Sequence, residues 1–157
     1  MKFSSRDDIN IPLSDVFTDG TDFATLERLA VRRGATVTRL DDLEVPGEGS
    51  QWRVEFVLRG KKRIMEAELT TYRAPNEIAF QGTIGGLGMQ FGLDLVALSP
   101  TRTRMSTGLE LTPESFAGRL LIQSMRLARA KLKNGYKQRT EKFAKMIEER
   151  HRSGIVA

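Results

Sequence analysis

Residues 113–150, PESFAGRLLIQSMRLARAKLKNGYKQRTEKFAKMIEER, form the stretch that decides the fold. At about 100° per residue, its apolar side chains recur on one broad face of a helix: Leu121, Met125, Ala128, Leu132, Tyr136, Phe143, Met146 and Ile147. Thr112 suits the N-cap and Pro113 suits the first helical position, where a missing N–H leaves no bond unmade. Gly135 predicts a bend partway along. The pattern predicts one helix of about 55 Å, which needs an apolar surface to lie on.

The residues before this helix predict the surface that it covers. Residues 2–11 alternate between apolar and polar side chains, as a strand does, and two short helices follow at 12–17 and 23–33. Thr21 or Asp22 suits the N-cap of the second helix, and Gly34 suits its end. Six further strands are predicted between short turns: 36–41, 50–59, 62–72, 77–84, 87–98 and 102–111.

This order of elements predicts an α+β fold: one strand, two helices, six strands and a long helix. Strands joined by short turns indicate an antiparallel sheet with one buried face. Glycines inside the strands indicate that the sheet curves around the helix: Gly82, Gly88, Gly92 and Gly108. The predicted architecture is therefore a curved antiparallel sheet wrapped on a C-terminal helix of about residues 113–150.

Composition narrows the classes of function. The 157 residues, 39% of them hydrophobic, fit one domain over residues 1–157, with a polar tail at 151–157. The absence of Cys excludes disulfides and thiolate sites, and no His, Asp or Glu cluster has metal-ligand spacing, so neither metal nor cofactor is expected. His151, the single histidine, is expected to be exposed and not catalytic. No apolar run suits a membrane span or a signal peptide, so a cytoplasmic location is expected.

At this point the pattern resembles the helix-grip fold of the START-like superfamily, also called SRPBCC. This superfamily includes polyketide cyclase/dehydrase-like proteins, birch-pollen-allergen-type proteins and lipid-transfer domains. The most telling local match is the end of the first strand with its following helix, Ile9-Asn10-Ile11-Pro12-Leu13-Ser14-Asp15-Val16-Phe17. The resemblance covers essentially the whole chain. It implies a cavity between the sheet and the long helix that takes an apolar or amphipathic small molecule, and it supplies no catalytic motif to carry over.

The alternation of the strands and the stripe of the helix predict which residues line such a cavity: Trp52, Phe56, Met65, Leu69, Phe80, Met89, Phe91, Met105, Leu109, Leu121, Met125, Leu132 and Tyr136. These side chains either fill a core or line a container. Arg139 joins the set because it lies within the helical stripe. It either reaches solvent past the sheet, pairs with an acid such as Asp7, or anchors a ligand carboxylate or phosphate.

The favoured interpretation is a non-enzymatic protein that binds a hydrophobic small molecule, such as a lipid or a polyketide-like compound. The alternative is a cyclase or dehydratase that uses Asp7, Tyr136 or Arg139 for acid–base chemistry. A third interpretation is a protein interaction module. The apolar stretch 116–122, FAGRLLI, is either covered by loops or offers a patch to a partner subunit, as in a homodimer, or to a membrane surface.

Charge is unevenly distributed along the chain. The net charge of +5 combines −3 over residues 1–118 with +8 over residues 119–157. The basic residues of the last helix either form a solvated face or attract an anionic partner. Because no aromatic stacking set accompanies them, no nucleic-acid partner is expected.

Overall fold

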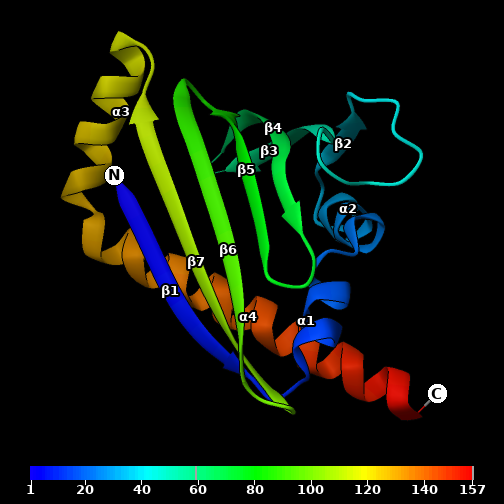
Figure 1. Cartoon of the computed structure of the whole chain (residues 1–157). Coiled ribbons are helices and arrows are strands. Elements are labelled where there is room, and N and C mark those ends of the chain that lie inside the picture. The colour runs from blue at the N-terminus through cyan, green and yellow to red at the C-terminus, as the bar shows by residue number, and fades with distance from the viewer. Residues whose placement is uncertain (59, 157) are drawn as a thin grey trace.

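The computed structural model describes residues 1–58 and 60–156 and contains one sheet with helices on one side (Figure 1). Its elements, in chain order, are β1 (Lys2–Ile9), α1 (Leu13–Gly20), α2 (Phe23–Arg32), β2 (Thr36–Arg39), β3 (Gln51–Leu58), β4 (Lys61–Arg73), β5 (Glu77–Ile84), β6 (Leu87–Ser99), β7 (Arg102–Pro113), α3 (Phe116–Leu127) and α4 (Arg129–Val156). The predicted strand 50–59 therefore ends at Leu58, and Arg59 lies outside the described residues.

The sheet is antiparallel throughout, with the strand order β1-β7-β6-β5-β4-β3-β2. The α+β helix-grip architecture predicted from the sequence is thus confirmed. Gly82 of β5 lies where two strands approach closely: a Cβ at this position would lie 1.9 Å from the carbonyl oxygen of Glu66 in β4. Only glycine allows the two backbones to approach this closely.

The prediction of a single C-terminal helix is wrong in two respects. Thr112 and Pro113 continue β7, where they pair with Gly88 and Leu87, and the N-cap is Ser115, whose hydroxyl accepts a 2.9 Å bond from the N–H of Gly118. The helical run also breaks at Ala128, between α3 and α4, whereas Gly135 lies inside α4.

The position of the break follows from packing. Alanine is the best helix former, so local propensity does not place an interruption at Ala128. Instead, α3 contacts β7 and α4 contacts β1, and the two helices run in clearly different directions along the sheet (Figure 1). The helix also continues beyond residue 150 to Val156, so the predicted polar tail begins as the last turns of α4.

The two N-terminal helices are fixed to the end of α4. Asp22 is the N-cap of α2 and accepts bonds from the N–H and the hydroxyl of Thr25, as predicted for an N-cap. The same carboxylate forms an ion pair with Arg150 of α4, whose guanidinium also donates to the carbonyl of Asp19. These bonds tie the end of α1 and the start of α2 to α4, and α2 contacts β2 of the sheet.

The core consists of two clusters. One lies under α1, α2 and the C-terminal half of α4 and includes Ile9, Val16, Phe17, Leu69 and Ile147. The other lies under α3 and is formed by Phe3, Leu87, Leu111 and Ile122. A cavity lies between the helices and the sheet in the middle of the molecule.

Candidate ligand-binding cavity

A cavity of about 530 Å³, partly open to solvent, is lined by the concave face of the sheet, α2 and α4. Its floor is made by side chains that alternate along the strands: Val37, Trp52, Val54, Met65, Ala67, Ile78, Phe80, Met89, Phe91, Leu93, Met105, Thr107 and Leu109. The helices contribute the remaining lining: Gly20, Phe23, Leu26, Glu27, Ala30, Tyr136, Arg139, Thr140 and Phe143. Carbon therefore dominates the lining, and the polar groups are few.

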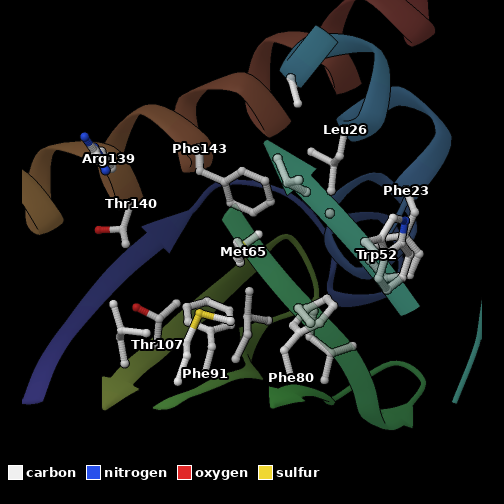
Figure 2. A pocket seen from close by; sticks show the side chains of 18 of the residues that line it. Phe23, Leu26, Trp52, Met65, Phe80, Phe91, Thr107, Arg139, Thr140 and Phe143 are labelled. Carbon is white, nitrogen blue, oxygen red and sulfur yellow. The ribbon is translucent and has the colours of Figure 1, made fainter. Parts of the chain in front are cut away.

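An aromatic wall closes the end of the cavity beneath α2. The ring of Trp52 lies 5.3 Å from Phe23 and 5.9 Å from Phe80, and Phe80 lies 6.3 Å from Phe91 (Figure 2). The polar edge of Trp52 is satisfied, since its indole N–H donates to Glu27 at 2.7 Å. The guanidinium of Arg39 lies 5.2 Å from the Trp52 ring centre. This wall offers flat, polarisable surface at centroid spacings typical of stabilising aromatic pairs.

Hydroxyl groups form the opposite wall, beneath α4. The hydroxyls of Thr107 and Tyr136 are 2.7 Å apart, and that of Thr107 is 2.8 Å from Ser5 on the edge strand. Burial raises the pKa of Tyr136, the Thr107 bond lowers it, and the carboxylate of Asp7 raises it. Because the net shift is upward, Tyr136 is protonated at neutral pH and can donate or accept a hydrogen bond.

Asp7 lies next to this hydroxyl wall and outside the apolar cavity. It belongs to a neighbouring polar hollow at β1, which shares Thr107 and Thr140 with the cavity. Its Oδ2 atom is buried without a hydrogen-bond partner. The pKa of Asp7 is raised above its ordinary value. Burial is the largest cause of this rise; the hydroxyl of Thr140 opposes it, and the negative charge of Glu141 adds to it.

Arg139 stands at the rim of the cavity. It is exposed, and no ion pair joins it to another described residue, so the structure does not support the alternative in which it pairs with Asp7. In Figure 2, Arg139 lies at the end of the cavity away from Trp52, whereas Phe143 points from α4 toward Met65. Among the described residues that form the lining, only Arg139 and Glu27 are charged; Arg139 forms no ion pair with a described residue, and Glu27 accepts the bond from Trp52.

The structure brings nine of the fourteen predicted lining residues together around the cavity: Trp52, Met65, Phe80, Met89, Phe91, Met105, Leu109, Tyr136 and Arg139. The other five lie elsewhere. Leu69 is fully buried in the core under α1 and α2, and Phe56 lies near the end of β3, outside the lining. Leu121 and Met125 of α3 and Leu132 of α4, on either side of the break at Ala128, pack against the cluster under α3.

The lining residues that α2 contributes were not predicted from the sequence. Phe23, Leu26 and Ala30 share one face of this helix and line the cavity. Their spacing was visible in the sequence, but spacing alone does not say which space a helical face covers. Phe143 and Thr140 were missed as lining residues for a related reason, since the direction of α4 depends on the break before it.

Other kinds of site are not indicated within residues 1–58 and 60–156. No group of three or more potential metal ligands is present there. No helix in that part of the chain is long and apolar enough to cross a membrane. His151 is partly exposed near the end of α4, with its Nδ1 3.9 Å from the carboxylate of Asp15, so it lies far along the helix from the cavity lining.

Comparison with known proteins identifies the fold. No family model and no curated protein matches the chain. Among solved structures, the Zhui aromatase/cyclase from Streptomyces sp. R1128 is 13% identical and has a TM-score of 0.70, with 98% of this chain and 97% of that chain covered. A point mutant of norcoclaurine synthase from Thalictrum flavum is 12% identical and has a TM-score of 0.66, with 96% of each chain covered.

A START superfamily protein from Mycobacterium smegmatis is also similar, at 13% identity and a TM-score of 0.57, with 85% of this chain and 94% of that chain covered. Identities this low show the fold and leave the activity open. This chain therefore has the START-like, or SRPBCC, helix-grip fold.

Proposed function

We propose that this protein binds a hydrophobic or amphipathic small molecule, such as a lipid or a polyketide-like compound, in the cavity between the sheet, α2 and α4. The observation that carries the proposal is the cavity itself. Its 530 Å³ falls in the range of roughly 300–1,000 Å³ that is usual for small-molecule sites. A hollow of this size lined by carbon leaves contiguous apolar surface exposed to water, which marks a ligand-binding site more often than a protein that only needs a core.

The lining favours a molecule with an extended apolar body. Met65, Met89 and Met105 are flexible and can adapt their shape to an irregular ligand. The aromatic wall suits a ring or a chain of conjugated carbons. Arg139 supplies a free guanidinium at the rim, which favours an acidic group, a carboxylate or a phosphate, at that end of the ligand.

The test compares two substitutions on the same helix. Ala30 lines the cavity and Ala24 is exposed on α2, so Ala30→Phe fills the cavity while Ala24→Phe adds the same ring to solvent. The probe is 1-anilinonaphthalene-8-sulfonate, an aromatic anion, titrated by fluorescence. We expect Ala30→Phe to weaken probe binding at least about tenfold and Ala24→Phe to leave it unchanged. Equal binding by both variants, or no binding by the original chain, contradicts the proposal.

The role of Arg139 is tested separately. Arg139→Gln should weaken the anionic probe severalfold and leave a neutral aromatic probe, N-phenyl-1-naphthylamine, unaffected. Equal losses for both probes would mean that Arg139 acts only on the shape of the cavity. Native mass spectrometry of the purified chain would then identify any ligand that is retained from the producing cell.

A second candidate function is acid–base catalysis of the cyclase or dehydratase type. It is favoured by the line of hydroxyls from Ser5 through Thr107 to Tyr136 and by the raised pKa of the neighbouring Asp7. The fold is shared with an aromatase/cyclase and with norcoclaurine synthase, which supports this alternative without assigning it. Conversion of a bound compound should then be abolished by Tyr136→Phe while its binding persists. A conversion that survives this substitution contradicts the proposed role of Tyr136.

A further inference from the structure

We infer that α3 docks the protein onto an anionic lipid bilayer. Figure 1 shows α3 at one end of the molecule, beside the end of β7. Phe116, Leu120 and Leu127 follow one another along this helix and are 76%, 51% and 93% exposed. Exposure of single apolar residues is common, but three large ones on one helical stripe form a patch that needs a partner.

The stripe is not a misplaced core face. At about 100° per residue, these three side chains lie opposite the face that packs on the sheet. That inner face is occupied by Gly118 and Ile122, which are buried, and by Leu121 and Met125, which are half-buried. A Cβ at Gly118 would come within 2.5 Å of the carbonyl oxygen of Gly86, so the helix is seated closely. This close contact prevents α3 from rotating about its axis to bury the outer stripe.

The charges around the stripe select the partner. Residues 115–140 contain seven Lys and Arg residues and no Asp or Glu. All seven are exposed, and none forms an ion pair with a described residue. Arg119 and Arg126 lie on one flank of the stripe, within α3 itself, and the remainder follow in the first turns of α4. Apolar side chains flanked by unpaired cations are the pattern of a helix that lies in the interface of an anionic bilayer.

Other occupants fit less well. A second copy of the chain that packs its α3 antiparallel on this stripe would place Arg119 and Arg126 near the same residues of its partner, and like charges repel. A nucleic acid would attract the cations but would leave Phe116, Leu120 and Leu127 without an apolar surface to enter. The inference does not depend on what the central cavity holds.

The experiment measures binding of the full chain to vesicles by co-sedimentation. The vesicles contain phosphatidylcholine with about one-third phosphatidylglycerol, or phosphatidylcholine alone, in about 0.1 M salt. The test variant is Phe116→Ser/Leu120→Ser/Leu127→Ser. The matched control is Val57→Ser/Val31→Ser/Val45→Ser, which removes apolar side chains that are 71%, 54% and 79% exposed elsewhere.

We expect the original chain and the control to bind the anionic vesicles, and the test variant to bind at least about tenfold more weakly. Binding should also fall severalfold on neutral vesicles and at about 0.5 M salt, because the cations then lose their attraction to the surface. Absence of binding to anionic vesicles, or equal binding by the test variant, overturns the inference. A dimer in sedimentation analysis that the test variant converts to monomer also overturns it, in favour of a second copy.

A spectroscopic variant covers the case in which the triple variant fails to fold. Leu127→Trp places an indole at the most exposed position of the stripe, while the native Trp52 is buried in the aromatic wall and changes little. Anionic vesicles should shift the added emission to shorter wavelength and protect it from an aqueous quencher. An unchanged spectrum would show that α3 does not enter the lipid interface.

Discussion

The space between the sheet and the C-terminal helices is filled under α3, the filled end, and hollow in the middle of the molecule under α4, the hollow end. At the filled end, under α3, Ile122 packs with Phe3, Leu87 and Leu111. At the hollow end, under α4, the sheet presents equally apolar side chains, such as Phe80 and Phe91, and these face the cavity. The sheet is apolar at both ends, so the difference arises in the helices.

The helices differ in what they present to the sheet. α3 presents Leu121, Ile122 and Met125 within one turn and so fills the space beneath it. Over the cavity, α4 presents Tyr136, Thr140 and Phe143, of which two end in hydroxyl groups that bond along the wall or to the helix backbone. The comparison indicates that helix composition decides where this fold keeps a void.

The largest expected effect comes from emptying the filled end. Ile122→Ala should lower the free energy of unfolding by about 3 kcal/mol, because it removes buried methylenes and leaves a new cavity. Met65→Ala should cost only about 1 kcal/mol, because Met65 already faces a void and lacks partners on that side. Urea denaturation of the two variants measures the difference. Equal losses would mean that the two ends are packed alike.

The next largest expected loss of stability concerns α2, which covers part of the cavity. Asp22→Ala removes the N-cap of α2 and the ion pair to Arg150, and should lower the free energy of unfolding by about 1–2 kcal/mol at neutral pH. Asp19→Ala is the control, since only the backbone carbonyl of Asp19 contacts Arg150. The Arg150 bond, followed by the Thr25 bond, holds the pKa of Asp22 below its ordinary value.

Because the pKa of Asp22 is lowered in the folded state, the stability lost in Asp22→Ala should depend on pH. The stabilisation by Asp22 is present above the ordinary aspartate value of about 4 and is lost as the pH falls through the lower pKa of the folded state. The difference in melting temperature between the original chain and Asp22→Ala should therefore narrow in acid. A difference that stays constant with pH would show that the cap acts without its charge.

Strand alternation and turn residues were enough to predict the sheet. Period-two patterns in β3 to β7 placed Trp52, Met65 and Phe91 on the concave face, where the structure has them. A strand side chain can point only to one face or the other, so a correct period leaves little freedom. This is why the floor of the cavity was largely predictable.

The helical side of the site was less predictable, because a helix can bend. A bend was expected at Gly135 on propensity, whereas the helical run breaks at Ala128, where tertiary packing overrides propensity. Leu121, Met125 and Leu132 were therefore predicted to line the cavity, whereas in the structure they pack at the filled end. The α2 wall depends on the Asp22–Arg150 pair, which joins residues far apart in the chain and leaves no local pattern in the sequence.

The smallest expected effect is a difference in melting temperature between substitutions of two adjacent aspartates of β1, Asp7 and Asp8. Asp7→Asn should raise the melting temperature by about 1–3 °C at neutral pH, because it removes a carboxylate whose Oδ2 is buried without a partner. Asp8→Asn is the matched control and should not stabilise, because Asp8 is exposed and forms ion pairs with Arg104 and Arg102.

The pH dependence of the two aspartates should have opposite signs. Burial raises the pKa of Asp7, so folding is favoured below the ordinary aspartate value of about 4 and loses that advantage as the pH rises through the higher pKa of the folded state. The gain from Asp7→Asn should therefore vanish in acid. The bond from Arg104 lowers the pKa of Asp8, so any loss from Asp8→Asn should shrink in acid instead. Melting curves between about pH 3 and pH 8 decide this. If Asp7→Asn destabilises at neutral pH, the contacts of the Asp7 carboxylate with the hydroxyls of Thr140 and Ser5 outweigh the burial of its Oδ2 atom.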